Sequence, residues 1–289
     1  MIKKNILSII LFRMRNQRRN ANILQINSTN GIVEEGYVKI GGIDQWITIR
    51  GENLNNPFLL FIHGGPASPY SIFNPLLRSW EKYFTIVQWD QRGAGKTFRR
   101  NGKEGNGIIT FNRLVQDGIE LSEYLCCRFN QPKLILIGSS IGSLIGSMMV
   151  KNRPGLFYAY VGTDQNAPDT QYLSYKLAFK AFMAVGNKKG VQLLEKMGLD
   201  SSKWNKKDYN KMNQLIVKAM VDVPNMITDL MLPSMFSSPN HTISDIIDIF
   251  KGMNFSLGYL FDDMLHFDFD QLGTKFDIPF LFFREIKIL

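Results

Sequence analysis

The chain has 289 residues, of which 45% are apolar and 20% charged, as is usual for globular proteins with one large domain or two small ones. Its net charge of +9 is unevenly placed, because six basic residues precede the first acidic residue, Glu34, and the other 28 nearly balance the 25 acidic ones. This distribution argues against a nucleic-acid-binding surface spread over the whole fold.

The first 30 residues are basic, rich in asparagine and free of acidic side chains. Their apolar run, residues 6–12, is only seven residues long, which is too short to span a bilayer. No small-residue cleavage site of a secretory signal follows it. We expect a disordered or loosely attached tail. The alternatives are a basic amphipathic segment, residues 1–20, lying on an anionic membrane, and export of the chain.

The next part of the chain alternates between strand-like and helical patterns. Two runs with alternating faces flank Gly41-Gly42 and predict an antiparallel hairpin. Continuous apolar runs then predict buried strands, and a segment with the apolar spacing of a helix precedes the strand at 134–137. The segments concerned are the hairpin strands 37–40 and 45–50, the strands 58–62, 85–89, 134–137 and 157–161, and the helix 111–128. This order predicts an α/β fold with a mostly parallel sheet flanked by helices.

The composition changes at residues 171–269, which are rich in Met, Lys, Asn and Asp and contain no clear buried strand. We interpret this stretch as a helical cap over the carboxyl ends of the strands, where such sheets bind ligands. A separate helical domain is the alternative, although the chain returns to a strand-like run at 278–283. The predicted division is a basic tail (1–30), the first part of the core (31–168), the cap (169–270) and an incomplete second part of the core (271–289).

The residues from 133 to 150 carry the most informative motif of the chain. A branched apolar run is followed by Gly138-Ser139-Ser140-Ile141-Gly142, and small and apolar residues then continue at lengths that suit a buried helix. Strand, G-x-S-x-G and helix together predict a nucleophile elbow, in which a strained serine is flanked by closely packed glycines. A serine- and glycine-rich loop without catalytic function is the alternative.

Three motifs in this order resemble those of the α/β-hydrolase superfamily, and of its proline iminopeptidase-like branch in particular. They are HGGPA from His63, DQRGAGKT from Asp90 and GSSIGS from Gly138. The resemblance covers residues 37–283 and is strongest in the first half. Three positions depart from the pattern of the branch: Ala67 replaces a glycine, Thr97 a serine and Ile141 a tryptophan.

The resemblance implies a role for each motif residue. Ser140 is then the nucleophile that forms an acyl-enzyme, and its oxyanion is held by the backbone N–H groups of Ile141 and of Gly64 or Gly65. His63 supports the oxyanion loop and is not the base. Asp90 and Arg92 form a structural turn near the site. The cap acids that are candidates for a substrate's amino terminus, with surface solvation as the default, are Glu195, Asp222 and Asp229.

The resemblance also leaves a gap, because the acid and the histidine that follow the nucleophile in this superfamily are not found. Asp164 is an alternative acid, and His241 and His266 are expected on the surface of the cap rather than at the site. We expect 284–289 to be a foreign tail from a frameshift, an early stop or an incomplete gene model. The competing interpretations are therefore an impaired serine peptidase or esterase acting on a small peptide, amide or ester, a membrane-attached esterase, and a non-catalytic binding protein with the same fold.

The remaining expectations concern thiols, cofactors and location. Cys126 and Cys127 are adjacent on a predicted helix, so two buried thiols in a reducing, cytoplasmic compartment are expected, with membrane association through residues 1–20 as the alternative. No metal site is expected, because no cluster of ligands has suitable spacing. No organic cofactor is expected, because residues 93–97 lack the upstream glycine spacing of a phosphate-binding loop. The sequence leaves the oligomeric state open.

Overall fold

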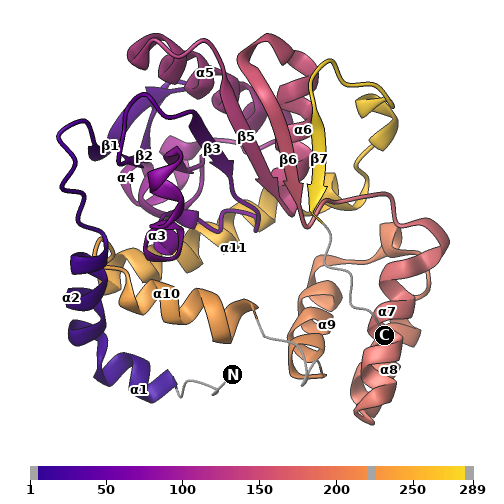
Figure 1. Cartoon of the computed structure of the whole chain (residues 1–289). Coiled ribbons are helices and arrows are strands. Elements are labelled where there is room, and N and C mark those ends of the chain that lie inside the picture. The colour runs from indigo at the N-terminus through magenta and orange to yellow at the C-terminus, as the bar shows by residue number, and fades with distance from the viewer. Residues whose placement is uncertain (1–5, 220–225, 284–289) are drawn as a thin grey trace.

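The computed structural model describes residues 6–219 and 226–283, and its centre is a seven-stranded sheet (Figure 1). The strand order is β1-β2-β4-β3-β5-β6-β7, in which β1, β2 and β4 are antiparallel neighbours and every later pair is parallel. The strands are β1 (Ile32–Ile40), β2 (Ile43–Gly51), β3 (Phe58–Ile62), β4 (Thr85–Asp90), β5 (Leu134–Ser139), β6 (Phe157–Thr163) and β7 (Phe280–Phe283). The predicted mixed, mostly parallel sheet is confirmed.

Burial follows position in the sheet. Every residue of β3 and β4 is buried, as expected for central strands covered on both faces. The edge strand β1 is buried only at its two ends and alternates between exposed and half-buried positions in between. The helices of the core are α4 (Gly95–Asn106), α5 (Phe111–Phe129) and α6 (Ile141–Asn152). Short helical turns complete the core: η1 (Tyr70–Phe73), α3 (Asn74–Leu77), η2 (Trp80–Lys82) and η3 (Pro154–Leu156).

The connection from β6 to β7 is helical in its described part, which agrees with the expected cap (Figure 1). One cluster of buried apolar side chains joins α7 to α9, and another joins α10 and α11 to η1 of the core. The elements are η4 (Thr170–Tyr172), α7 (Leu173–Ala184), α8 (Lys188–Met197), η5 (Ser201–Lys203), α9 (Lys206–Ala219), η6 (Met226–Met231), α10 (Leu232–Ser237), α11 (Ile243–Leu265) and η7 (Phe269–Leu272).

The N-terminal segment forms two helices, α1 (Ile6–Leu11) and α2 (Arg13–Ile23), which lie against α10 (Figure 1). Ile9 and Leu24 are buried, and polar side chains of α2 donate hydrogen bonds to backbone carbonyls beyond α10. The prediction of a loosely attached tail is therefore wrong for these helices. In the described parts of the chain, no helix has both the length and the apolar character needed to cross a membrane.

Two smaller expectations also need correction. Cys127 is exposed and Cys126 half-buried, because neighbouring positions on α5 point in different directions and cannot both face the sheet. The last expected strand, 278–283, is formed as Phe280–Phe283 and pairs with β6, with Leu281, Phe282 and Phe283 exposed. The segment 284–289, for which a foreign tail was expected, lies outside the described residues.

Candidate active site

Ser140 occupies a sharp turn between β5 and α6. Its backbone has φ +52° and ψ −126°, a combination that a residue with a side chain rarely adopts and that stores strain. Two hydrogen bonds fix the turn: the Ser140 N–H donates to the Thr163 carbonyl at 3.2 Å, and the Ser143 N–H donates to the Ser140 carbonyl at 2.8 Å. The local geometry is thus that of the elbow expected from the sequence.

The two glycines of the motif allow this turn to sit tightly against its neighbours. A Cβ atom on Gly142 would overlap the Ile62 carbonyl oxygen and would lie 2.7 Å from that of His63. A Cβ on Gly138 would lie 2.8 Å from the hydroxyl of Tyr160. Glycine is therefore required at both positions by close packing of α6 against the end of β3 and of β5 against β6.

The loop after β3 lies directly on the elbow. A Cβ on Gly64 would stand 2.8 Å from Ser140 Cβ and 2.7 Å from the Ser139 carbonyl oxygen. The next residue of this loop, Gly65, is exposed and has φ +129°, a backbone conformation that favours glycine. Ile141 is the first residue of α6, so its N–H has no partner within the helix. The structure therefore brings Gly64, Ser140 and Ile141 together, as the resemblance implied.

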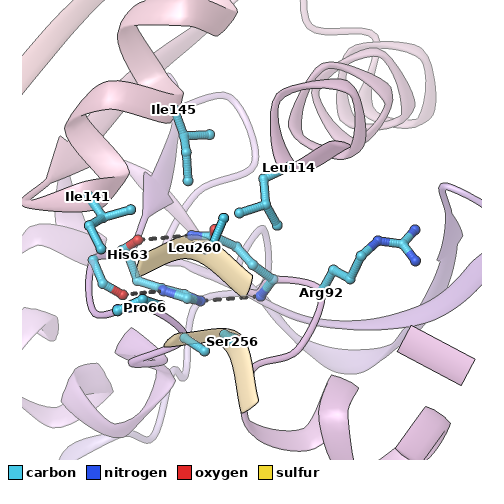
Figure 2. A pocket seen from close by; sticks show the side chains of 11 residues that line it. His63, Pro66, Arg92, Leu114, Ile141, Ile145, Ser256 and Leu260 are labelled. Atoms are coloured by element: carbon cyan, nitrogen blue, oxygen red, sulfur yellow. Dashed lines mark hydrogen bonds between the residues drawn. The ribbon is translucent and has the colours of Figure 1, made fainter. Parts of the chain in front are cut away.

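His63 is buried at the base of this loop, and both of its ring nitrogens are engaged (Figure 2). The Gln91 N–H donates to Nε2 at 3.2 Å, so the ring proton is on Nδ1, which lies 2.9 Å from the Gly64 carbonyl oxygen. Burial lowers the pKa of His63 to about 4, and the ring is neutral at physiological pH. An imidazole bound in this way holds the loop and has no free nitrogen to accept a proton from Ser140.

Asp90 and Arg92 lie in the turn after β4, and each is held by the protein itself. Asp90 accepts from the Ser71 hydroxyl at 3.0 Å and the Lys96 N–H at 2.9 Å, while its burial raises its pKa to about 6. The Arg92 guanidinium pairs with Asp117 at 2.8 Å and extends away from His63 (Figure 2). Both side chains therefore have the hydrogen-bonded surroundings expected of a structural turn.

The other two histidines lie elsewhere. His266 is exposed at the end of α11, as expected. His241, in contrast, is only 3% exposed, so its predicted place on the surface is wrong. Its Nδ1 lies 2.8 Å from Ser238 Oγ and its Nε2 lies 3.4 Å from Ser71 Oγ. Burial first, and the charge of Lys96 second, lower its pKa to about 4.

Comparison with known proteins agrees with this geometry. Residues 57–184 match the family described as the alpha/beta hydrolase fold, a stretch that includes the glycine-rich loop after β3, the Asp90 turn and the turn at Ser140. The crystal structure of a membrane phospholipase A, described as a bacterial virulence factor, superimposes with a TM-score of 0.56 at 14% identity, covering 95% of this chain and 74% of that one. The chain has the α/β-hydrolase fold.

The curated relatives are named as a probable aminopeptidase and as proline iminopeptidases. A probable aminopeptidase, YbaC of Bacillus subtilis, is 35% identical over 142 residues, which are 48% of this chain and 44% of the relative. A proline iminopeptidase of Clostridioides difficile is 27% identical over 113 residues, 39% of this chain and 36% of the relative. The chain thus spans less than half the length of the curated relatives that it matches.

A cavity of about 10 Å³, room for one water-sized group, lies behind the loop and the elbow (Figure 2). Apolar side chains from α5, α6 and α11 close it, with Leu114, Ile145 and Leu260 among them. The floor of this candidate site is therefore filled by packed side chains. Within the described residues, no three His, Cys, Asp or Glu side chains are grouped as a metal ion would require.

Several residues near the site carried no signal in the sequence. The Tyr70 hydroxyl donates to Ser139 Oγ at 2.8 Å, next to the elbow, and Ser71 joins Asp90 to His241. Neither residue belongs to a motif, and only the fold brings them to the site. Of the expected acids, Asp164 and Glu195 are exposed, Asp229 lies in η6 within hydrogen-bond distance of Thr228, and Asp222 lies outside the described residues.

Proposed function

We propose that this α/β-hydrolase carries serine acyl-transfer chemistry, with Ser140 as the nucleophile. In this mechanism, the hydroxyl oxygen attacks a carbonyl carbon and forms an acyl-enzyme, and the N–H groups of Ile141 and of Gly64 or Gly65 hold the oxyanion. The observation that carries the proposal is the strained backbone of Ser140 between β5 and α6, with Gly64 packed against its Cβ. Strain of this kind persists where the surrounding structure enforces it, commonly at functional sites.

The substrate class that we propose is a small peptide, amide or ester. The names of the relatives, an aminopeptidase and a proline iminopeptidase, support a peptide or amide carbonyl at the scissile position. Ile141 places an apolar side chain, where the branch has tryptophan, between the elbow and the small cavity. This difference favours a substrate pocket of different shape from that of the iminopeptidases.

None of the described histidines is placed to act as the general base for Ser140. All three histidines of the chain are described, and each has hydrogen-bond partners other than Ser140. Serine without a base is a poor nucleophile, and loss of one triad member in serine proteases costs on the order of 10⁴-fold to 10⁶-fold in turnover. We therefore expect slow acylation by this chain. A ligand-binding protein with the same fold is the second candidate, favoured by the engagement of these three rings.

The decisive experiment is hydrolysis of a proline naphthylamide and a short-chain nitrophenyl ester, with fluorophosphonate labelling in parallel. Ser140→Ala is the comparison, because it removes the hydroxyl and retains the backbone turn. Slow hydrolysis and slow labelling that Ser140→Ala abolishes support the proposal. Equal rates for the two chains contradict it and favour the binding protein.

A further inference from the structure

The N-terminal helices α1 and α2 have two different faces. On one face, residues at helical spacing turn inward: Ile9 and Leu24 are buried, and Arg13, Gln17 and Asn20 lie between them. These three polar side chains donate to the carbonyls of His241, Ser238 and Ser237 at 2.7, 2.7 and 2.9 Å. Ser237 is the last residue of α10, where a helix leaves carbonyls without internal partners, and Ser238 and His241 lie just beyond it.

Near the junction of α1 and α2, several large apolar side chains are not covered by this anchoring contact. Ile10, Leu11, Phe12 and Met14 are 48%, 76%, 52% and 67% exposed, so that four large apolar side chains within five residues are open to solvent. Single exposed apolar residues are common, but a contiguous group at one tip of a molecule indicates a contact surface. We call Ile10, Leu11, Phe12 and Met14 the apolar tip.

Positive charge lies next to the apolar tip. Arg15, Arg18 and Arg19 are exposed, and among the described residues none of them has a carboxylate partner. No acidic residue occurs before Glu34 in the sequence. Arg15 and Arg19 also line an open groove of about 440 Å³ between these helices and α10, together with Ile9, Phe12 and Pro233. Cationic groups therefore lie beside exposed apolar side chains on α1 and α2, which are held against α10.

We propose that α1 and α2 dock this protein onto an anionic phospholipid surface. The apolar tip inserts among the acyl chains, Arg18 contacts the lipid phosphates, and the groove between Arg15 and Arg19 receives a phosphate headgroup. Apolar burial and attraction of arginine to anionic headgroups are the two forces that hold amphipathic segments at membranes, and either alone gives marginal binding. A nucleic acid would use the arginines and leave the tip in water, so the tip favours the lipid.

The test is flotation of the full chain with vesicles of phosphatidylcholine alone or with 30% phosphatidylglycerol, in 0.15 M salt. We expect at least tenfold stronger binding to the anionic vesicles, because each arginine at such a surface contributes roughly fivefold. The triple variant Arg15→Gln, Arg18→Gln, Arg19→Gln is expected to lose on the order of 100-fold, and Leu11→Ser with Met14→Ser at least tenfold.

Matched controls separate this site from general charge and apolarity. One control removes three exposed cations from α7 and α8 with the substitutions Lys176→Gln, Lys180→Gln and Lys189→Gln. The other removes two exposed large side chains from the surface of the sheet domain with Tyr83→Ser and Ile108→Ser. Both controls are expected to bind as the parent chain does, with circular dichroism unchanged in every variant. Equal binding to the two vesicles, equal loss in the lysine control, or full binding by the variant of Leu11 and Met14 would overturn the proposal. Failure of hydrolysis would leave this result untouched.

Discussion

Replacing Gly64 with alanine is expected to push the oxyanion loop away from the nucleophile elbow. The new Cβ would lie 2.8 Å from Ser140 Cβ and 2.7 Å from the Ser139 carbonyl oxygen. Carbon atoms in contact normally stand about 3.5–4.0 Å apart, so the loop and the elbow must separate by roughly 1 Å. The backbone of Gly64 has no positive φ, so this effect is steric and does not arise from the torsion angles.

Two magnitudes follow from that displacement. Overpacking of a well-packed interior costs about 1–3 kcal/mol, and we expect Gly64→Ala to lower the free energy of unfolding by that amount. An oxyanion donor that moves by about 1 Å loses on the order of 10²-fold in rate. Fluorophosphonate labelling of Ser140 should slow by this factor relative to the parent chain.

The assay pairs urea unfolding with the labelling rate, and Gly36→Ala in β1 is the control. A Cβ on Gly36 meets no atom within 4 Å, so this variant should unfold and label as the parent chain does. If Gly64→Ala is as stable as Gly36→Ala, the loop does not pack on the elbow as described, and the reasoning is refuted. A destabilised variant that labels at the parent rate would instead refute the oxyanion role of Gly64.

Three further predictions concern strain and buried charge. Ser140→Gly should be more stable than Ser140→Ala by about 1 kcal/mol in urea unfolding, because glycine accepts the positive φ; equal stability would mean that no strain is stored. His63 and His241 have pKa values of about 4 in the folded chain and ~6.5 in the unfolded chain. Because the unfolded state binds more protons between these pH values, the free energy of unfolding should fall as the pH drops from 6.5 to 4. Each histidine contributes on the order of 3 kcal/mol of this loss, and Asp90, whose raised pKa of about 6 acts in the opposite sense, offsets about one such contribution. The free energy of unfolding from urea titrations should therefore be lower at pH 4 than at pH 7 by a net amount on the order of 3 kcal/mol. Arg92→Met removes one of the two arginines that pair with the buried carboxylate of Asp117, which keeps Arg113 and Gln45 as partners. The loss of these charged hydrogen bonds should cost about 1.5–3 kcal/mol, and a loss below about 1 kcal/mol would argue against a structural role.

The sequence by itself determined the central strands, the sharp turn at Ser140 and the glycine-rich loop after β3. These features depend on local rules: an apolar run without charges must be buried, and a glycine before and after Ser140 permits a strained turn that other residues would block. The same local pattern places His63 at the end of a buried strand. The folded chain adds that its two ring nitrogens are bound to Gln91 and Gly64.

Tertiary structure alone decided what lies around that framework. His241 is in a polar stretch that is typical of a cap surface, yet the packing of α10 and α11 on η1 buries it against Ser71. The basic N-terminal segment carries no local sign of its anchor, because its partners are backbone carbonyls about 220 residues away, which no side-chain pattern encodes. Contacts between distant segments depend on how the whole chain packs, and for this reason the sequence pattern located the sharp turn at Ser140 but misplaced both His241 and the N-terminal segment.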